Sequence, residues 1–332
     1  MSERTPGVPG VVVGVDIGGT KVLAGVVEPD GTVTSTALRT TPGRRVATSQ
    51  VEDALVEAVL EAAVGRPLAA VGVAAAGFVD SAGERVMFAP HLPWQGEPLR
   101  DLLEARLGCR VVLDNDANCA AVAEWTFGAA RGAGTALMMT LGTGIGGAVL
   151  LGGRVLHGAN GMAGEFGHMQ VVPQGRSCEC GRSGCWEQYS SGNALVRDAR
   201  ALMAEQPSVL EEMCGGNPER ITGPMVTAAA EEGDLVARRA FASVGDWLGV
   251  GAANLVAALD PERVVIGGGV SAAGDKLLDP ARAALARTLV GAEHRTVPAL
   301  VAAHLGPAAG LVGAAQSARL PRSGAGAEVP VA

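Results

Sequence analysis

The chain has 332 residues, and at about 150 residues per domain this length predicts two domains. An apolar share of 48% with 18% charged residues excludes an intrinsically disordered chain. Lys and Arg number 26 against 34 Asp and Glu, so the formal net charge is −8. We therefore expect binding to neither nucleic acid nor a membrane, and any polyanionic ligand must be held by local donors and a metal ion.

We expect neither a targeting signal nor a membrane-spanning segment in this sequence. The opening segment MSERTPGVPG has no apolar core, so we expect no signal peptide and a cytoplasmic protein. Residues 132–153 reach membrane-spanning length, but they are rich in glycine and alternate like strands around a turn, which argues against a transmembrane helix. The 6 cysteines are too unevenly spaced for a disulfide framework, and the cluster near residue 180 indicates a metal site.

Apolar periodicity predicts alternating strands and helices. In chain order we expect strands over 11–16, 21–28 and 32–38, a helix over 51–64, a strand over 70–75, a helix over 99–106, a strand over 110–113, a helix over 116–127, two strands within 134–151, mostly helix over 190–256, a strand over 264–266, and helices over 275–290 and 310–320. Residues 323–332 are expected to form a disordered tail.

Two segments of the sequence resemble each other. Residues 11–27, VVVGVDIGGTKVLAGVV, and residues 136–151, ALMMTLGTGIGGAVLL, each read as an apolar strand, a turn of Gly and Thr, and a second apolar strand. They are either unrelated hairpins or copies of one duplicated unit. The shared order of glycine and threonine favours duplication, which predicts two similar α/β domains that face each other.

The first of these turns has the composition of a phosphate cradle. Its glycines permit close backbone approach, successive N–H groups form an anion-binding concavity, and side-chain donors follow. The residues are Asp16, Gly18, Gly19, Thr20 and Lys21. Asp16 can hold Mg²⁺ through water. The alternative is an ordinary hairpin turn with a solvated lysine. Neither a Walker A loop nor a dinucleotide fingerprint is present.

Two further glycine-rich loops complete the predicted nucleotide site. Gly142, Thr143 and Gly144 form a second cradle, so that two cradles would grip one nucleoside triphosphate. Gly267, Gly268 and Gly269 follow a strand, where adenine and ribose can lie against bare backbone. A tight turn between strand and helix is the alternative for this third loop.

One imidazole and three thiols have the spacing of a closed zinc site. His168, Cys178, Cys180 and Cys185 provide the Cys₃His set of a structural zinc ion, and the alternative is a group of reduced thiols in a glycine-rich loop. With one ring nitrogen on the metal, the other N–H of His168 can meet a sugar hydroxyl. Nearby carboxylates at Glu165 and Glu187 are acceptors of the kind that sugars need, or else exposed surface groups.

Asp116 stands where a predicted strand gives way to a helix. The helix N-terminus favours its ionised form, which a general base requires. An Asp in this place is also a common N-cap. The local sequence leaves both roles open.

Together these motifs resemble the actin-like sugar kinases and, within them, the ROK family (repressors, open reading frames, kinases), most closely its bacterial glucokinases. The resemblance runs from about Val11 to Gly313 and is most specific over residues 158–187, where GANGMAGEFGH precedes CECGRSGCWE. It implies two actin-like (ribonuclease H-like) α/β domains flanking a cleft. The small domain would cover 1–120, with a helix over 308–322 packing on it, and the large domain 121–307 would carry the zinc loop.

The resemblance also implies an activity and roles for residues. The chain would be a glycolytic phosphotransferase that moves a phosphoryl group from ATP, with Mg²⁺, to the 6-hydroxyl of glucose. Asp116 would be the catalytic base, and Asp114 would lie outside the site because the family varies there. The same four zinc ligands are implied, and the sugar-binding set would be Gly77, Asn115, Asp116, Glu165, His168 and Glu187.

Several alternatives remain open. Fructose, N-acylmannosamine or allose could replace glucose, and polyphosphate could replace ATP. The family also contains sugar-responsive repressors, but these carry a helix-turn-helix domain ahead of the first cradle, and ten residues precede Val11 here. We expect a homodimer or a homotetramer.

Overall fold

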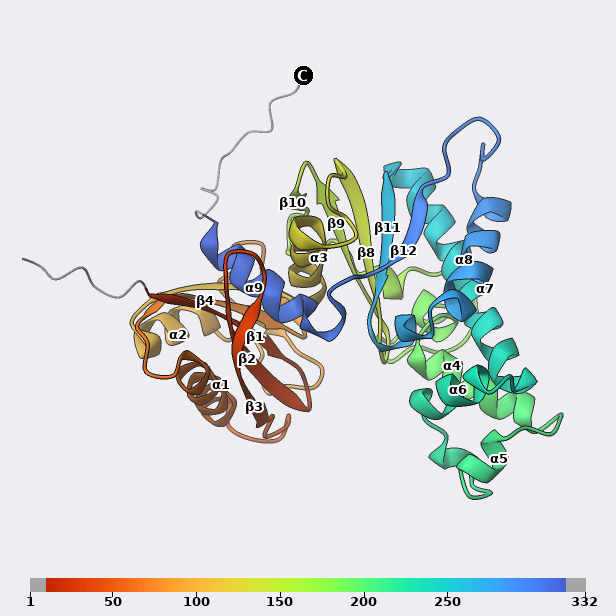
Figure 1. Cartoon of the computed structure of the whole chain (residues 1–332), viewed down its shortest axis with the longest axis horizontal. Coiled ribbons are helices and arrows are strands. Elements are labelled where there is room, and N and C mark those ends of the chain that lie inside the picture. Colours follow the sequence, from red (N-terminus) through yellow and green to blue (C-terminus); the bar gives the residue numbers. More distant parts are fainter. Residues whose placement is uncertain (1–9, 321–332) are drawn as a thin grey trace, which may run out of the picture. The chain divides into compact units, whose positions relative to one another are not determined.

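The computed structural model describes residues 10–320, which form two five-stranded mixed sheets with helices around them (Figure 1). The tail expected over 323–332 lies outside the described residues, as do the last two residues of the helix expected to reach 322. The expected α/β fold class is confirmed, and a third, two-stranded sheet pairs β5 (Phe78–Val79) with β6 (Val86–Phe88).

The first sheet has the order β3-β2-β1-β4-β7. Strand β1 pairs antiparallel with β2 and parallel with β4, and β4 pairs parallel with β7. Its strands are β1 (Val11–Ile17), β2 (Lys21–Val27), β3 (Val33–Thr40), β4 (Leu68–Ala75) and β7 (Arg110–Asn115).

The second sheet repeats this plan with the order β10-β9-β8-β11-β12. Strand β8 pairs antiparallel with β9 and parallel with β11, and β11 pairs parallel with β12. Its strands are β8 (Thr135–Leu141), β9 (Ile145–Leu151), β10 (Arg154–Val155), β11 (Arg263–Gly267) and β12 (Ala299–Ala302). The similarity of the two glycine hairpins in sequence therefore extends to the whole strand order of each sheet.

The described chain divides into two compact units. The first unit comprises residues 10–128, 154–163 and 308–320, and the second comprises Ala129–Gly153 and Gly164–Pro307. The boundary expected at residue 120 falls inside helix α3 (Asp116–Phe127), which stays with the first unit because it packs along α9 (Ala309–Arg319). Periodicity also gives no sign that residues 154–163 belong to the first unit.

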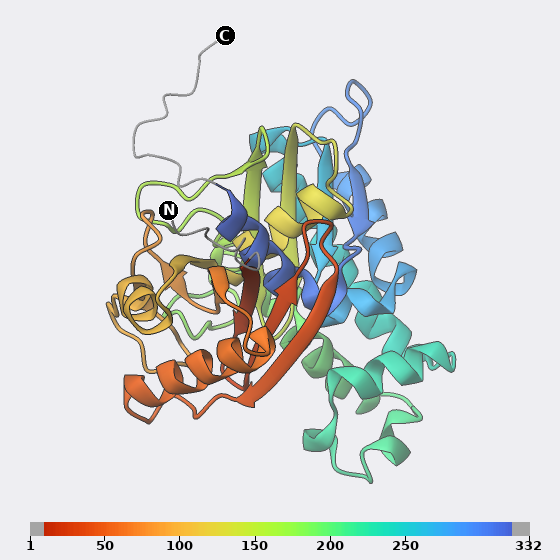
Figure 2. The same ribbon diagram turned by 60° about the vertical axis from the view of Figure 1, so that its left-hand side comes forward.

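Helices cover both faces of the first sheet. Helices α1 (Thr48–Ala63) and α2 (Leu99–Leu107) place Leu55 and Leu103 in a buried cluster that also contains Val13 and Val15 of β1. Figure 2 shows α1 along the outer strands β2 and β3.

The opposite face of the first sheet receives α9, which packs on β1 and β4. Its close approach depends on two glycines that are register partners, Gly14 on β1 and Gly72 on β4. A Cβ at Gly14 would lie 2.0 Å from the carbonyl oxygen of Leu311, and one at Gly72 would lie 1.8 Å from that of Ala314. Part of the high glycine content therefore serves packing rather than turns.

The second unit is rich in helices. These are α4 (Gly192–Met203), α5 (Leu210–Met213), α6 (Gly223–Glu231), α7 (Leu235–Leu259) and α8 (Asp275–Thr288). Among the described helices, α7 alone is long and apolar enough to cross a membrane, but half of its most apolar window is buried. It packs on α4, α6 and α8, so its composition is that of a core helix. Residues 132–153, which also reached membrane-spanning length, form β8 and β9.

Four short strands were not predicted from the periodicity of apolar residues. These are β5 (Phe78–Val79), β6 (Val86–Phe88), β10 and β12, each of two to four residues. An alternation of apolar and polar positions needs more residues than these strands contain, and β12 pairs only with a strand far away in sequence.

Candidate functional site

The first glycine turn joins β1 to β2 and is closed by its own backbone. The N–H of Gly18 donates to the carbonyl of Lys21 at 3.0 Å, and the Thr41 hydroxyl donates to the carbonyl of Gly18 at 2.7 Å. A Cβ at Gly19 would meet the His91 side chain at 2.5 Å, whereas one at Gly18 would meet nothing within 4 Å. The space beside Gly18 is therefore the part of this turn that is open to a ligand, and Thr20 and Lys21 are exposed next to it.

Asp16 lies two residues before this turn, near the end of β1. Burial raises the pKa of its carboxyl, while the positive charge of Lys21 acts in the opposite direction. A half-buried carboxylate beside an open glycine turn suits a cation that accompanies phosphate groups.

The second glycine turn joins β8 to β9 and is also closed by a backbone hydrogen bond. The N–H of Gly142 donates to the carbonyl of Gly144 at 3.0 Å, and the N–H of Gly192 donates to the carbonyl of Gly142 at 2.7 Å. A Cβ at Gly142 would meet nothing within 4 Å, but one at Gly144 would lie 2.3 Å from Oε2 of Glu187. Gly142 and the exposed Thr143 therefore provide the open part of this turn.

In the third loop, packing accounts for two of the three glycines. Gly267 ends β11, and a Cβ there would lie 2.7 Å from the Met138 side chain. Gly268 has φ +83°, and a Cβ there would lie 2.4 Å from the carbonyl oxygen of Leu141. Only Gly269 has open space around its Cα. The tight strand-to-helix turn thus explains Gly267 and Gly268, and Gly269 is the best candidate for a ligand contact.

Helix α3 begins at the predicted catalytic base. Asn115 is the N-cap of this helix, because its Oδ1 accepts hydrogen bonds from the N–H groups of Ala117 at 2.8 Å and Asn118 at 3.3 Å. The capping role that the local sequence offered to Asp116 is therefore filled by Asn115. Asp116 is the first helical residue and is half-buried, where the positive end of the helix dipole favours an ionised carboxylate.

The other end of the Asn115 amide ties the cap to the loop after β4. Its Nδ2 donates to the carbonyl of Gly77 at 3.0 Å. A Cβ at Gly77 would lie 2.7 Å from the carbonyl oxygen of Phe88, so close packing on β6 also requires glycine here. Two residues of the predicted sugar-binding set are thus in direct contact within the first unit.

Asp114, which the family resemblance placed outside the site, is closely connected to it. Its Oδ1 accepts from the N–H of Asn115 at 2.7 Å and from Nδ2 of Asn118 at 2.8 Å, and its Oδ2 lies 2.8 Å from Nε2 of His157. Asp114 is buried. The sequence carried no signal for this group, because His157 comes from a part of the chain 43 residues away.

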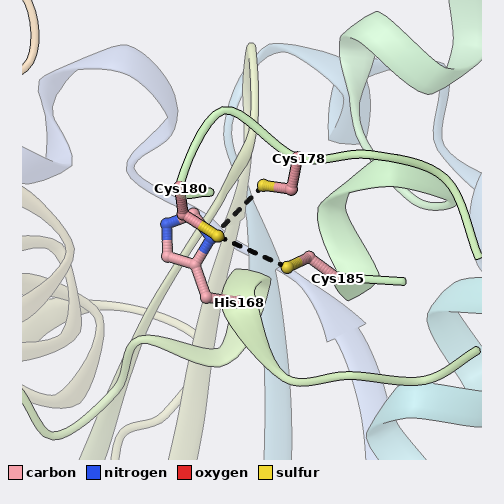
Figure 3. A group of neighbouring side chains, drawn as sticks. All are labelled: His168, Cys178, Cys180 and Cys185. Carbon is pink, nitrogen blue, oxygen red and sulfur yellow. Dashed lines mark hydrogen bonds between the residues drawn. The ribbon is translucent and has the colours of Figure 1, made fainter. Parts of the chain in front are cut away.

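The four predicted zinc ligands gather at one place in the second unit (Figure 3). Their ligand atoms all lie within 4.8 Å of one another, with 3.6 Å between Sγ of Cys180 and Cys185 and 3.8 Å between Sγ of Cys178 and Nδ1 of His168. Zn–S bonds of about 2.3 Å in a tetrahedron separate sulfur ligands by about 3.8 Å, so the donor set fits zinc in number, type and spacing.

Backbone hydrogen bonds shape the loop that carries these ligands. The N–H of Cys178 donates to the carbonyl of Arg182 at 2.8 Å, and that of Gly184 donates to the carbonyl of Arg176 at 2.7 Å. The loop therefore folds back on itself and brings its cysteines together. Burial raises the pKa of the Cys178 thiol to about 12, so a bound cation is needed to keep it as a thiolate at neutral pH.

Two carboxylates adjoin the metal cluster. Oε1 of Glu187 accepts a hydrogen bond from the Cys178 thiol at 3.2 Å and lies 3.6 Å from Nδ1 of His168, while its Oε2 faces Gly144. Burial raises the pKa of Glu165, and Glu187 adds to that effect, while His168 lowers this pKa. Glu187 therefore contacts two side chains of the Cys₃His cluster. Glu165 is half-buried.

Comparison with known proteins yields close relatives. The chain matches the ROK family over residues 12–319. It is 44% identical over 315 residues to the glucokinase of Streptomyces coelicolor, a match that covers 94% of this chain and 98% of that protein. The structure is similar to that of a ROK family glucokinase from Streptomyces griseus in complex with glucose and AMPPNP, with a TM-score of 0.86 and 45% identity over 93% of this chain and 99% of that chain.

A xylose repressor from Caldicellulosiruptor bescii is also similar, at 32% identity over 64% of this chain. That match covers 53% of the repressor.

Proposed function

We propose that this chain, which belongs to the ROK family, is a glucokinase that transfers the γ-phosphoryl group of ATP to the 6-hydroxyl of glucose. The observation that carries the proposal is the 45% identity, over 93% of the chain, to a glucokinase whose structure contains glucose and a nucleotide analogue. The open glycine turns, the carboxylate at the start of α3 and the Cys₃His cluster support it independently.

Asp116 is the group that we assign to proton transfer. It accepts the proton of the 6-hydroxyl while that oxygen forms a bond to the γ-phosphorus and the bond to the β,γ-bridging oxygen breaks, which releases ADP. Asp116 is the first residue of α3, where the positive end of the helix dipole stabilises negative charge on a carboxylate.

The residues that we assign to the sugar are Gly77, Asn115, Asp116, Glu165, His168 and Glu187. Glu165 and Glu187 are the two carboxylate acceptors, because the hydrogen bond that Glu187 accepts from the Cys178 thiol ends when a metal ion holds Cys178 as a thiolate. The contribution of Asn115 is largely positional, since its amide oxygen caps α3 and its amide nitrogen binds Gly77.

The nucleotide is held by the open parts of the glycine turns. Gly18, Gly142 and Gly269 leave space in which phosphate, ribose or base can approach the backbone, and Thr20, Lys21 and Thr143 add donors. Mg²⁺, when bound, neutralises charge on the transferred phosphoryl group, and Asp16 is the carboxylate that we expect to hold it through water.

The metal cluster has a structural role in this proposal. His168, Cys178, Cys180 and Cys185 would hold zinc, which when bound cross-links the loop and takes no part in the transfer. Because Nδ1 of His168 faces Cys178, its Nε2–H is left as a donor for a sugar hydroxyl.

The deciding experiment is a coupled assay of the purified protein on a panel of hexoses with ATP or polyphosphate as donor. We expect the highest kcat/KM for glucose with ATP. A higher kcat/KM for fructose, N-acylmannosamine or allose would replace glucose as the proposed substrate. A higher kcat/KM with polyphosphate would replace ATP as the proposed donor. Sugar binding without phosphorylation of any hexose would favour a sensor related to the xylose repressor. Sedimentation would decide between the dimer and the tetramer that we expect.

A further inference from the structure

A buried carboxylate stands directly behind the strand-to-helix junction that carries the proposed base. Asp114 accepts hydrogen bonds from the backbone N–H of Asn115 and from the side-chain amide of Asn118. It therefore holds the residue before Asp116 and the residue two positions after it.

His157 provides a further hydrogen bond to this carboxylate. Its Nε2 lies 2.8 Å from Oδ2 of Asp114, and the side chains are 37% and 12% exposed, respectively. The hydrogen bond to Asp114 raises the pKa of His157, although its burial acts in the opposite direction. The pair is thus a charge-assisted hydrogen bond in a partly buried place, which is the stronger kind.

The segment that carries His157 is itself fastened to the first unit. The Ser81 hydroxyl donates to the carbonyl of Ala159 at 3.3 Å, and within the segment the N–H of Ala163 donates to the carbonyl of His157 at 3.1 Å and closes its loop. A Cβ at Gly161 would lie 2.1 Å from the carbonyl oxygen of Val79, so this backbone packs tightly. Because its segment is held at these points, His157 presents its imidazole to Asp114 from a fixed place.

We propose that His157 is a positioning residue for the proposed phosphoryl transfer: it holds Asp114, which holds the start of α3 so that the carboxylate of Asp116 is aimed at the substrate hydroxyl. The inference rests on the proposed function. His157 does not touch substrate and acts only through Asp114 and the helix start. Misplacement of a reacting group by about 1 Å costs on the order of 100-fold in rate, so a loose helix start lowers kcat.

The test compares His157→Leu, which removes the donor, with His157→Gln, which keeps an N–H donor of similar reach. We expect His157→Leu to lower kcat by about 10-fold to 100-fold with a much smaller change in KM for ATP, and His157→Gln to retain most of the wild-type kcat. His294→Gln is the matched control, because His294 is 83% exposed and belongs to the second unit. We expect it to behave as wild type.

A double-substitution cycle separates positioning from general stabilisation. If His157 acts through Asp116, then adding His157→Leu to Asp116→Asn lowers kcat little further, because the group being aimed is already gone. Independent effects would multiply. The inference would be overturned if the kcat loss of the double variant equalled the product of the two single losses. It would also be overturned if His157→Leu had a wild-type kcat and only a lower Tm.

A second variant covers the case in which His157→Leu does not fold. Asp114→Asn keeps the size of the side chain and removes the charge, and we expect the same loss of kcat with the same lack of additivity with Asp116→Asn. A wild-type kcat in folded Asp114→Asn would also overturn the inference. Failure of the proposed function is distinguishable, because wild-type protein would then phosphorylate no hexose.

Discussion

The side-chain amide of Asn115 donates to the carbonyl oxygen of Gly77 at 3.0 Å while its oxygen caps helix α3. One side chain therefore joins the end of β7, the first turn of α3 and the loop after β4. Because Asp116 follows Asn115 directly, the proposed base and part of the proposed sugar-binding set share one local scaffold. The roles of Asn115 and Asp116 can nevertheless be separated by substitution.

We expect Asn115→Ala to weaken both stability and sugar binding. Loss of the N-cap costs about 1 kcal/mol of unfolding free energy, and loss of the bond to Gly77 adds to it. Urea unfolding and calorimetry with glucose measure the two effects. Thr222→Ala is the control, because Thr222 caps α6 in the second unit and should lower stability alone. An unchanged glucose affinity in Asn115→Ala would remove this residue from the sugar-binding set.

The substitution Asp116→Asn should give a different result. It keeps size and hydrogen-bonding capacity but removes the proton acceptor, so we expect kcat to fall by roughly 10²-fold to 10⁴-fold. Dissociation constants for glucose and ATP should stay close to wild type, as befits an interaction used mainly in the transition state. Steady-state kinetics and calorimetry on one preparation check this. A near wild-type kcat would transfer the role of base to another carboxylate, Asp114 or Glu165.

The glycine turns provide a test of the nucleotide assignment that does not disturb the fold. A Cβ at Gly142 meets no protein atom within 4 Å, so Gly142→Ala should fold normally and weaken ATP binding while glucose binding remains. Gly223→Ala is the matched control, since its Cβ also has open space but Gly223 lies at the start of α6. Calorimetry that found ATP affinity unchanged and glucose affinity lost in Gly142→Ala would contradict the assignment.

Metal analysis tests the Cys₃His cluster. We expect about one zinc ion per chain, and we expect Cys178→Ser to lose the ion, local order of the loop and glucose affinity together, because folding of such a loop is coupled to metal binding. Cys109→Ser serves as the control, since Cys109 is half-buried and lies in the first unit, outside the cluster. Fully active protein without zinc would refute the assignment.

The His157–Asp114 pair makes a pH-dependent contribution to stability. The pKa of His157 is raised in the folded chain, so the folded state holds this proton more tightly than the unfolded state. The stabilisation is therefore complete below the unfolded pKa of about 6.5 and is lost as pH rises through the higher folded pKa. Unfolding free energies of wild type and His157→Gln, measured from about pH 5.5 to about pH 8.5, should differ most at low pH. A difference independent of pH would contradict this linkage.

Local pattern was sufficient for several features of this protein. The spacing of His168, Cys178, Cys180 and Cys185 predicts a Cys₃His metal site, and the structure brings the four ligand atoms within 4.8 Å of one another, because a short loop gathers its own side chains. The long strands and helices follow from apolar periodicity, and the two glycine hairpins identify the repeat that the strand order of both sheets shows. These features depend on residues that are close in sequence.

Tertiary structure decided the features that depend on distant residues. Gly14 and Gly72 allow α9 to approach the sheet, whereas Gly142 leaves open space beside its Cα. The amino-acid sequence alone does not distinguish these two uses of glycine. His157 meets Asp114 because residues 154–163 pack with the first unit, which no periodicity encodes. The sequence by itself predicted the glycine turns, the Cys₃His set and Asp116 as candidate site groups, because each is recognised from neighbours in the sequence. Only the packing of segments far apart in the chain decided which of those groups are open and which are held by hydrogen bonds to others, because burial and hydrogen bonding depend on neighbours in space.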